Sequence, residues 1–280
     1  MGVKTVQHAR NLATEDDDGR DFSAAVWHDC QIDDIKNGYI TGVIHEYDFT
    51  ELPKTPATTE GNFGLFSQFS STGGFINAHT GQGGGWVFGS DGDNEGASIR
   101  TRATPFKLSR ASQKLWFEVV LTPSTADDTK NGMFVGLMED AVLTATVPIA
   151  ADGTLADQNF VGFHRLEGDG DQIDTVYKAN GVTQVTVQAD ALNTALAAAT
   201  RVKLGLVYEQ GLGLRSGTRY TLTFFQNGRP LGTTKTIPST DGDDFPNDVG
   251  LGLVFAVLNA TGTSPGDWTL DKWRCVQLLA

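Results

Sequence analysis

KLWFEVVLTPS, residues 114–124, begins the block that decides the fold, and NGMFVGLMED (131–140) and NFVGFHRLEGDGDQIDTVYKANGVTQVTV (159–187) complete it. Each contains short runs rich in aromatic and β-branched residues, and Gly, Asn and Asp separate these runs. Such a pattern is typical of consecutive antiparallel hairpins. We predict strands over 115–121, 133–138, 160–166, 173–177 and 182–187, which would form the middle of a β-sandwich.

The rest of the chain repeats this pattern. The clearest hairpin is RYTLTFFQNGRPLGTTKTI (219–237), where Asn227-Gly228 predicts a type I′ turn. The one stretch that predicts a helix is ADALNTALAAAT (189–200), which is rich in Ala and Leu and has Asp190 as a cap. Further strands are predicted at 24–28, 38–49, a hairpin pair of 63–69 with 74–78, 86–88, 97–102, 201–210, 249–261 and 267–279. Together they predict an all-β chain that folds as one antiparallel β-sandwich of the jelly-roll type.

Charge and composition exclude several classes of partner. The chain has 280 residues and a formal net charge of -13. An acidic field of this size disfavours both nucleic acid and anionic membrane, so we expect neither as a partner. Cys30 and Cys275 are too few for a disulfide framework, and two free thiols are expected rather than one bridge.

The first residues predict neither a signal peptide nor a membrane span. Residues 1–22 are polar and acidic, with a Glu-Asp-Asp-Asp run at 15–18. On composition alone a solvated tail is favoured. The alternative is an arm that orders against a partner, with Val3, Val6 and Leu12 as small apolar contacts.

The candidate for catalysis is Glu167-Gly168-Asp169-Gly170-Asp171, whose acids have a spacing of two residues. A retaining glycosidase needs two carboxyl groups close together on one face. The flanking glycines favour a solvated hairpin turn instead, so no catalytic residue is expected. The neighbouring His164 is more typical of a structural histidine.

Acidic turns could also hold calcium, which needs six to eight oxygen ligands. The candidates are Asp91–Glu95, Glu167–Asp171 and Asp241–Asp244. None has the spacing of a calcium-binding loop, and Asp-Gly is common in ordinary turns. We therefore expect no metal and no cofactor. Trp27 and Trp86 could stack on a sugar, although tryptophan in a sandwich is more often part of the core.

The order of these segments resembles a family of tailed-bacteriophage structural proteins, the head decoration or cement proteins with a concanavalin A-like (laminin-G-like) jelly roll. The resemblance covers residue 85 to the C-terminus and is carried by 91–108, KLWFEVVL (114–121), MFVGLMED (133–140), 151–178, 201–209, TLTFFQNGRPLGT (221–233), 250–261 and LDKWRCVQL (270–278).

The resemblance implies a non-enzymatic virion protein that decorates and stabilises the outside of an icosahedral capsid after synthesis in the host cytoplasm. Its partner would be the major capsid protein, and it would form a homo-oligomer, a dimer or trimer, on the capsid. With this role, residues 1–22 become an attachment arm with Val3, Val6 and Leu12 as capsid contacts, and 23–280 form the single sandwich domain.

Two alternatives have different functions. The first is a carbohydrate-binding, lectin-like module of a phage fibre, with a glycan as ligand. The second is a glucanase-like sandwich, which would need the carboxyl pair that the sequence does not clearly provide.

Overall fold

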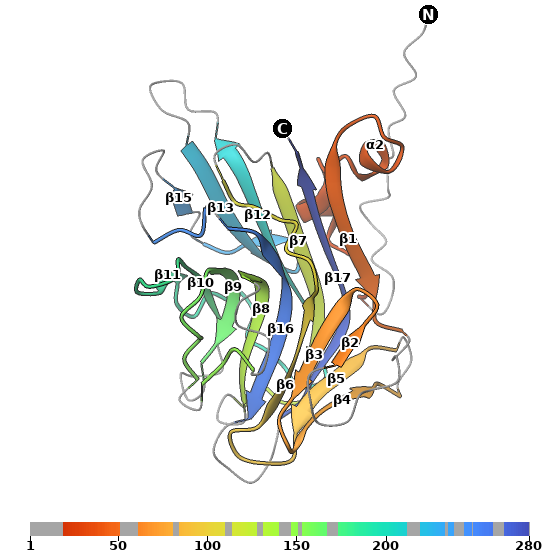
Figure 1. Cartoon of the computed structure of the whole chain (residues 1–280), viewed down its shortest axis with the longest axis vertical. Coiled ribbons are helices and arrows are strands. Elements are labelled where there is room, and N and C mark those ends of the chain that lie inside the picture. Colours follow the sequence, from red (N-terminus) through yellow and green to blue (C-terminus); the bar gives the residue numbers. More distant parts are fainter. Residues whose placement is uncertain are drawn as a thin grey trace, which may run out of the picture.

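A computed structural model describes residues 19–50, 61–80, 84–109, 114–127, 131–139, 147–150, 153–166, 173–211, 219–232, 235–237, 244–247, 249–259 and 266–279. Within these ranges the regular structure is almost entirely β-strand, and the strands form two antiparallel sheets packed face to face (Figure 1). The predicted all-β antiparallel sandwich of the jelly-roll type is confirmed.

Sheet A, the nine-stranded sheet, carries the Asn-Gly hairpin at one edge. Asn227 and Gly228 have φ angles of 49° and 74°, which are the positive values that a type I′ turn requires. Two strands of this sheet lie outside its main order of neighbours: β1 (Gly42–Asp48) pairs with β17, and β15 (Lys235–Ile237) pairs with β13. The main path runs β14 (Arg229–Pro230), β13 (Arg219–Gln226), β12 (Val202–Gly211), β7 (Leu115–Pro123), β17 (Trp268–Leu278), β5 (Trp86–Ser90) and β4 (Gly74–Ala78).

Sheet B has eight strands, and four of them come from the block that decides the fold. β8 to β11 are consecutive antiparallel hairpins, as predicted, whereas β7 from the same block lies in sheet A. The order is β11 (Val185–Gln188), β10 (Asp174–Lys178), β9 (Phe160–Arg165), β8 (Asn131–Glu139), β16 (Leu251–Asn259), β6 (Gly96–Thr101), β3 (Phe66–Ser70) and β2 (Gly61–Phe63).

The main core lies between the two sheets. Trp86, Trp268 and Trp273 are fully buried in it, together with aliphatic and aromatic side chains from both sheets. The outer face of sheet B carries a second apolar cluster that includes Phe134, Phe160 and Val254, and Ile149 packs on it. All nine residues of β16 are therefore buried.

The outer face of sheet A is covered by the chain's own N-terminal part. We refer to residues 19–40 as the strap; it contains the short helices α1 (Ala24–Trp27) and α2 (Ile32–Lys36). The prediction of a strand at 24–28 is wrong. A helical turn forms there because the Val26 N–H donates to the Ser23 carbonyl (3.0 Å) and Val26 packs into an apolar cluster with Trp116 and Val276 of sheet A.

The predicted helix at 189–200 is also wrong. Asp190 and Ala199 have φ angles of 48° and 54°, which no right-handed helix contains. The segment is an irregular loop, with Ala191 and Leu196 buried in the core. A short helix is only marginally stable by propensity, so these tertiary contacts override it.

The predicted hairpin of 63–69 with 74–78 does not form. β3 pairs with β2 and β6 in sheet B, whereas β4 pairs with β5 in sheet A. The connection crosses between the sheets, and Ser71 anchors it by donating its backbone N–H to the Gly96 carbonyl (3.0 Å). Turn residues between two strands mark a reversal of the chain but do not say that the two strands pair.

Cys30 and Cys275 are free thiols, as expected. Burial raises the pKa of Cys30 to about 12 and that of Cys275 well above its usual range. Among the described residues, no helix has the length and apolar character needed to cross a membrane.

Candidate functional site

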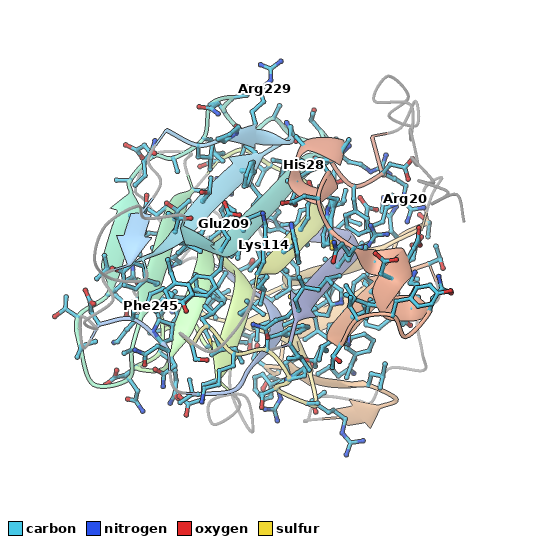
Figure 2. The ribbon with its side chains drawn as sticks, turned by 90° about the horizontal axis from the view of Figure 1, so that it is seen from above. Arg20, His28, Lys114, Glu209, Arg229 and Phe245 are labelled. Carbon is cyan, nitrogen blue, oxygen red and sulfur yellow. The ribbon has the colours of Figure 1, made fainter. Side chains whose placement is uncertain are left out.

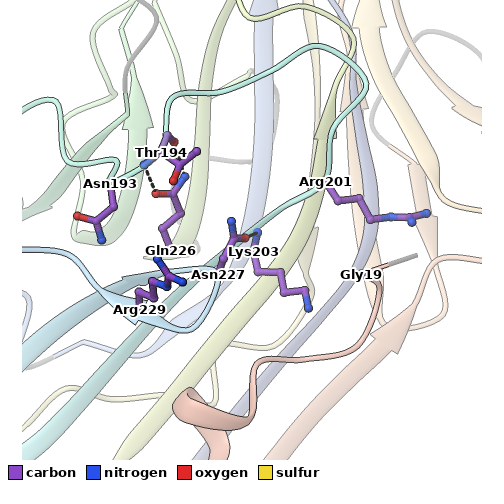
Figure 3. Close-up of a pocket in the computed structure, with 8 residues that line it drawn as sticks. All are labelled: Gly19, Asn193, Thr194, Arg201, Lys203, Gln226, Asn227 and Arg229. Carbon is purple, nitrogen blue, oxygen red and sulfur yellow. Dashed lines mark hydrogen bonds between the residues drawn. The ribbon is translucent and has the colours of Figure 1, made fainter. Parts of the chain in front are cut away.

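A polar pocket of about 410 Å³ lies at the end of sheet A where β12 begins and β13 ends (Figure 3). Three separate parts of the chain form its wall: the first residue of the strap, the loop before β12, and the β13–β14 turn. Its lining consists of Gly19, Asn193, Thr194, Arg201, Lys203, Gln226, Asn227 and Arg229. Apart from Gly19, every lining residue has a side chain that can form hydrogen bonds.

The Asn-Gly turn is fixed against the first residues of β12. The Asn227 N–H donates to the Lys203 carbonyl (2.8 Å), and the Lys203 N–H donates to Oδ1 of Asn227 (2.9 Å). Gly228 is required here, because a Cβ on it would lie 2.9 Å from Cβ of Ser23 in the strap. The turn, the strand and the strap therefore hold one another at the floor of the pocket.

The loop wall is held by Gln226, the last residue of β13. Its Oε1 accepts the Thr194 N–H (2.9 Å), and its Nε2 donates to the Thr194 carbonyl (2.6 Å). Nδ2 of Asn193 donates to the Pro230 carbonyl (3.1 Å). Because Gln226 uses both ends of its amide on the loop, it serves as a support, while the exposed Asn193 and Thr194 form the rim.

Three cationic side chains line the pocket, and they differ in their surroundings. Nε of Arg201 donates to Oδ2 of the buried Asp271 (2.9 Å), which sits at an irregularity in the pairing of β17 with β7. Lys203 points away from the main core and is 4% exposed. Arg229 is exposed. Of the described residues that line the pocket, none has a carboxyl group.

The strap is held by a buried carboxyl group on β7. Oε2 of Glu118 accepts the Ser23 N–H (2.8 Å) and the indole N–H of Trp27 (2.7 Å). Burial raises the pKa of Glu118 to about 7, although these hydrogen bonds and the charge of Lys203 act in the opposite direction. The guanidinium of Arg274 lies over the rings of Phe22 and Trp27, 4.2 and 5.1 Å from their centroids.

Further ion pairs hold the strap near its beginning and near its middle. Near its beginning, Arg20 pairs with Asp48 of β1 at 2.8 Å. Near its middle, Asp29 accepts hydrogen bonds from Lys114 and from the indole of Trp116, and Lys114 also pairs with Glu209 (Figure 2). These contacts hold the strap against sheet A, and Gly19 at its beginning lines the pocket.

Of the acidic turns that the sequence suggested for metal binding, the structure fully describes Asp91–Glu95, which joins β5 to β6. Glu167, Asp169 and Asp171 lie outside the described residues, as do Asp241 and Asp243. Val3, Val6 and Leu12 of the predicted arm also lie outside them. In the parts of the chain that the structure describes, no group of three or more His, Cys, Asp or Glu side chains could hold a metal ion.

His164 and the two tryptophans have structural surroundings. The ring Nε2 of His164 lies 2.9 Å from the Gly153 carbonyl, and the side chain is 4% exposed. Trp86 is fully buried in the main core, whereas Trp27 belongs to the strap and packs against sheet A.

The pocket residues were missed by the sequence analysis. They come from positions 19, 193–203 and 226–229, and they approach only because the loop at 190–200 is not a helix. The sequence contains only local indications of the pocket. Asn227-Gly228 indicates a tight turn, and Lys203 is a cation in an otherwise apolar strand.

Comparisons with known proteins give similarity in structure alone. No protein-family model matches the chain, and no curated protein sequence matches it significantly. Solved structures that are similar include the potassium-bound carbohydrate recognition domain of Emp46p (TM-score 0.49, 12% identity, 75% of this chain and 88% of that chain). The VIP36 exoplasmic domain bound to Ca²⁺ and Man3GlcNAc has a TM-score of 0.49 and 10% identity over 77% of this chain and 85% of its own. Peanut lectin in complex with a peptide has a TM-score of 0.49 and 11% identity over 85% of this chain and 99% of its own.

All three are lectins or lectin-like domains, and none of them is a phage capsid protein. With TM-scores under 0.5, these similarities assign neither a ligand nor a residue role to this chain. The fold and the pocket together describe the protein as a jelly-roll β-sandwich that has a polar pocket at the end of one sheet.

Proposed function

We propose that the protein is a non-enzymatic carbohydrate-binding protein and that the pocket at the end of sheet A binds the sugar. The observation that carries the proposal is the lining: all seven of its side chains are amides, a hydroxyl or cations. Sugar hydroxyls both donate and accept hydrogen bonds, and amide and hydroxyl side chains can match both roles. An apolar ligand would leave these polar groups unsatisfied, which is costly.

The size of the pocket agrees with this class of ligand. A volume of about 410 Å³ falls at the lower end of the range of about 300–1,000 Å³ for small-molecule sites. Asn193 uses Nδ2 to bind Pro230, and Asn227 uses Oδ1 to bind Lys203, so their other amide atoms are the ones that a sugar would meet. A ligand of one or two sugar rings is expected.

The proposed absence of catalysis rests on the same lining. Glycoside hydrolysis needs two carboxyl groups on either side of the bond that is cleaved. Among the described residues, Asp271 is a carboxyl group that is hydrogen-bonded to the lining, and it accepts bonds from Arg201 and Thr122. A carboxylate held in this way is suited to orienting Arg201 rather than to attacking a sugar.

Glycan-array screening with neutral and acidic oligosaccharides, followed by isothermal titration calorimetry, tests the proposal. Asn193→Ala should weaken sugar binding by about three- to ten-fold, the effect of one lost hydrogen bond of ~1 kcal/mol. Asn77→Ala is the matched control, because Asn77 is an exposed amide residue on β4 at the opposite edge of sheet A. Absence of binding to the whole set, or equal loss in both variants, would refute a sugar site in this pocket.

A further inference from the structure

The strap is held on the outer face of sheet A by apolar packing and by one buried carboxyl group. Val26 and Trp27 pack on the sheet, and the Ser23 N–H and the Trp27 indole N–H both donate to Oε2 of Glu118 on β7. We propose that the strap is a pH-sensitive cover of sheet A, which is released as one unit when the pH rises while the sandwich stays folded.

Release would change the surroundings of Glu118 completely. With the strap in place Glu118 is 0% exposed, and no described group donates a hydrogen bond to its other oxygen, Oε1. An ionised carboxyl group is costly in such a place, because water cannot solvate it. Both donors to Oε2 come from the strap, so its departure would remove them and admit water to the carboxyl group.

The direction of the pH effect follows from what remains beside Glu118. Arg274 of β17 is opposite Glu118 in the strand register, so the two side chains share the outer face of the sheet. After release Glu118 would have both water and this cation, which favour the carboxylate, whereas burial under the strap raises its pKa to about 7. Docking of the strap is therefore strongest at low pH and weakens as the pH rises toward 7.

The other charged groups around Glu118 are accounted for. The charge of Lys203 on β12 acts to lower the pKa of Glu118, and Arg274 also pairs with Glu46 of β1 at 2.5 Å. Three ion pairs join the strap to the sheet, and each has a partner that is at least 40% exposed, so each contributes little. These pairs are Arg20 with Asp48, Asp21 with Lys272, and Asp29 with Lys114.

His28 is a second group on the strap that has to be considered. Its ring Nδ1 lies 4.0 Å from a carboxyl oxygen of Asp29, and histidine is the side chain that ordinarily gains charge near neutral pH. A positive charge on His28 would also favour docking at low pH. The experiment therefore has to separate His28 from Glu118.

Release would also remove one wall of the pocket. Gly19 lines the pocket, and Ser23 is so close to the β13–β14 turn that a Cβ on Gly228 would lie 2.9 Å from the Cβ of Ser23. This part of the inference rests on the proposed carbohydrate-binding function. A sugar that contacts this wall binds the docked form better and so holds the strap in place, because such coupling is reciprocal.

Hydrogen–deuterium exchange of the full chain from pH 5 to 8 tests the release without any sugar. Backbone hydrogen bonds such as those of Val26, Cys30 and Ile35 protect the strap. Exchange of residues 23–37, divided by the intrinsic rate at each pH, gives the opening constant of the strap. This constant should rise by up to about ten-fold per pH unit until about pH 7 and then level off, the effect of one proton.

Residues 251–259 of β16 are the reference for unfolding of the whole domain. Exchange of the strap as slow as that of β16 overturns the proposal, because the strap would then open only when the sandwich unfolds. An opening constant that does not change with pH overturns it as well.

Two variants assign the pH dependence to one group. Glu118→Gln keeps an oxygen that can accept both hydrogen bonds but cannot ionise, so its opening constant should be independent of pH. His28→Gln is the control and should keep the dependence of the wild type. A dependence that persists in Glu118→Gln, or that disappears in His28→Gln, overturns the role of Glu118.

Trp27→Phe tests the contact itself. It keeps an aromatic ring and removes the indole N–H, so the opening constant at pH 6 should rise by about three- to ten-fold, the effect of one lost hydrogen bond. Tyr39→Phe is the matched control, because it removes a hydroxyl from a residue of the strap that is 79% exposed. Equal opening constants in the two variants contradict a specific contact between Trp27 and Glu118.

The final measurement separates the pocket from the strap. The oligosaccharide that binds most tightly in the glycan array should slow the exchange of residues 23–37. A sugar that binds without slowing it overturns the coupling to the pocket and leaves the proposed function in place. Absence of sugar binding overturns the proposed function, whereas release of the strap, measured without sugar, is unaffected by that result.

Discussion

Glu118 is a fully buried carboxyl group that holds the strap against sheet A. Burial raises its pKa from 4.5 to about 7, so the folded protein holds a proton there more tightly than the unfolded chain does. The sign follows from linkage. This group contributes stability that is fully present below about pH 4.5 and is lost as the pH rises through about 7.

Glu118→Gln should therefore flatten the pH dependence of the free energy of unfolding between pH 4.5 and 7. The loss of stability with rising pH should decrease by up to about 1.4 kcal/mol per pH unit, the effect of one proton. Urea unfolding at a series of pH values measures this slope.

Glu46→Gln is the control for this change. Burial acts to raise the pKa of Glu46, but the hydrogen bond and charge of Arg274 outweigh it and lower the pKa. The contribution of Glu46 is therefore lost only as the pH falls below about 4.5, outside the measured range. Identical slopes in the wild type and in Glu118→Gln would show that Glu118 does not titrate as its surroundings require.

Individual elements differ in how well the sequence predicted them. β7 to β10, β12, β13, β16 and β17 fall where aromatic and β-branched runs predict strands, because burial between two sheets rewards that composition. The failures at 24–28 and 189–200 share a cause. In both segments, contacts with distant parts of the chain decide the conformation: Val26 packs against Trp116 and Val276, and Ala191 and Leu196 are buried in the main core.

The pocket was beyond sequence reasoning for the same reason. Local pattern predicts a turn at Asn227 and an outward Lys203, but it contains no information about which loop covers them. Gln226 recruits Thr194 from 32 positions away, and the strap brings Gly19 from the other end of the chain. The candidates in the sequence were carboxylates in glycine-rich turns. The side chains that line the pocket are instead amides, a hydroxyl and cations.

Within sheet B, two glycines face each other across the pairing of β8 with β9, Gly136 and Gly162. A Cβ on Gly136 would lie 2.3 Å from the Val161 carbonyl oxygen, which belongs to the ladder itself. Gly136→Ala should therefore lower the free energy of unfolding by about 3 kcal/mol, as overpacked sites do.

Gly132→Ala is the control on the same strand. A Cβ there would lie 3.4 Å from the Arg165 carbonyl oxygen, an ordinary contact, and the loss should be within about 1 kcal/mol. Chemical denaturation of both variants gives the comparison. A similar loss in both would mean that the close approach of the two strands does not restrict these positions.

The predicted place on the outside of a phage capsid stays a prediction, together with the arm at 1–22 and the capsid as partner. A sugar pocket at one end of sheet A is compatible with it, because a particle-bound protein can expose a pocket to the medium. Electron microscopy of purified particles would locate the protein.

The Asn227-Gly228 sequence allows a slow covalent change, the deamidation of Asn227. When glycine follows asparagine, little hinders attack of the glycine backbone nitrogen on the side-chain amide. The reaction releases ammonia and leaves a cyclic imide that water opens to aspartate or isoaspartate. In this molecule the new carboxylate would appear inside a cation-lined pocket, and the Lys203 N–H that now binds Oδ1 holds the side chain in place. Ageing of the purified protein should therefore produce a more acidic form that binds sugar less well, because the amide nitrogen of Asn227 has been lost.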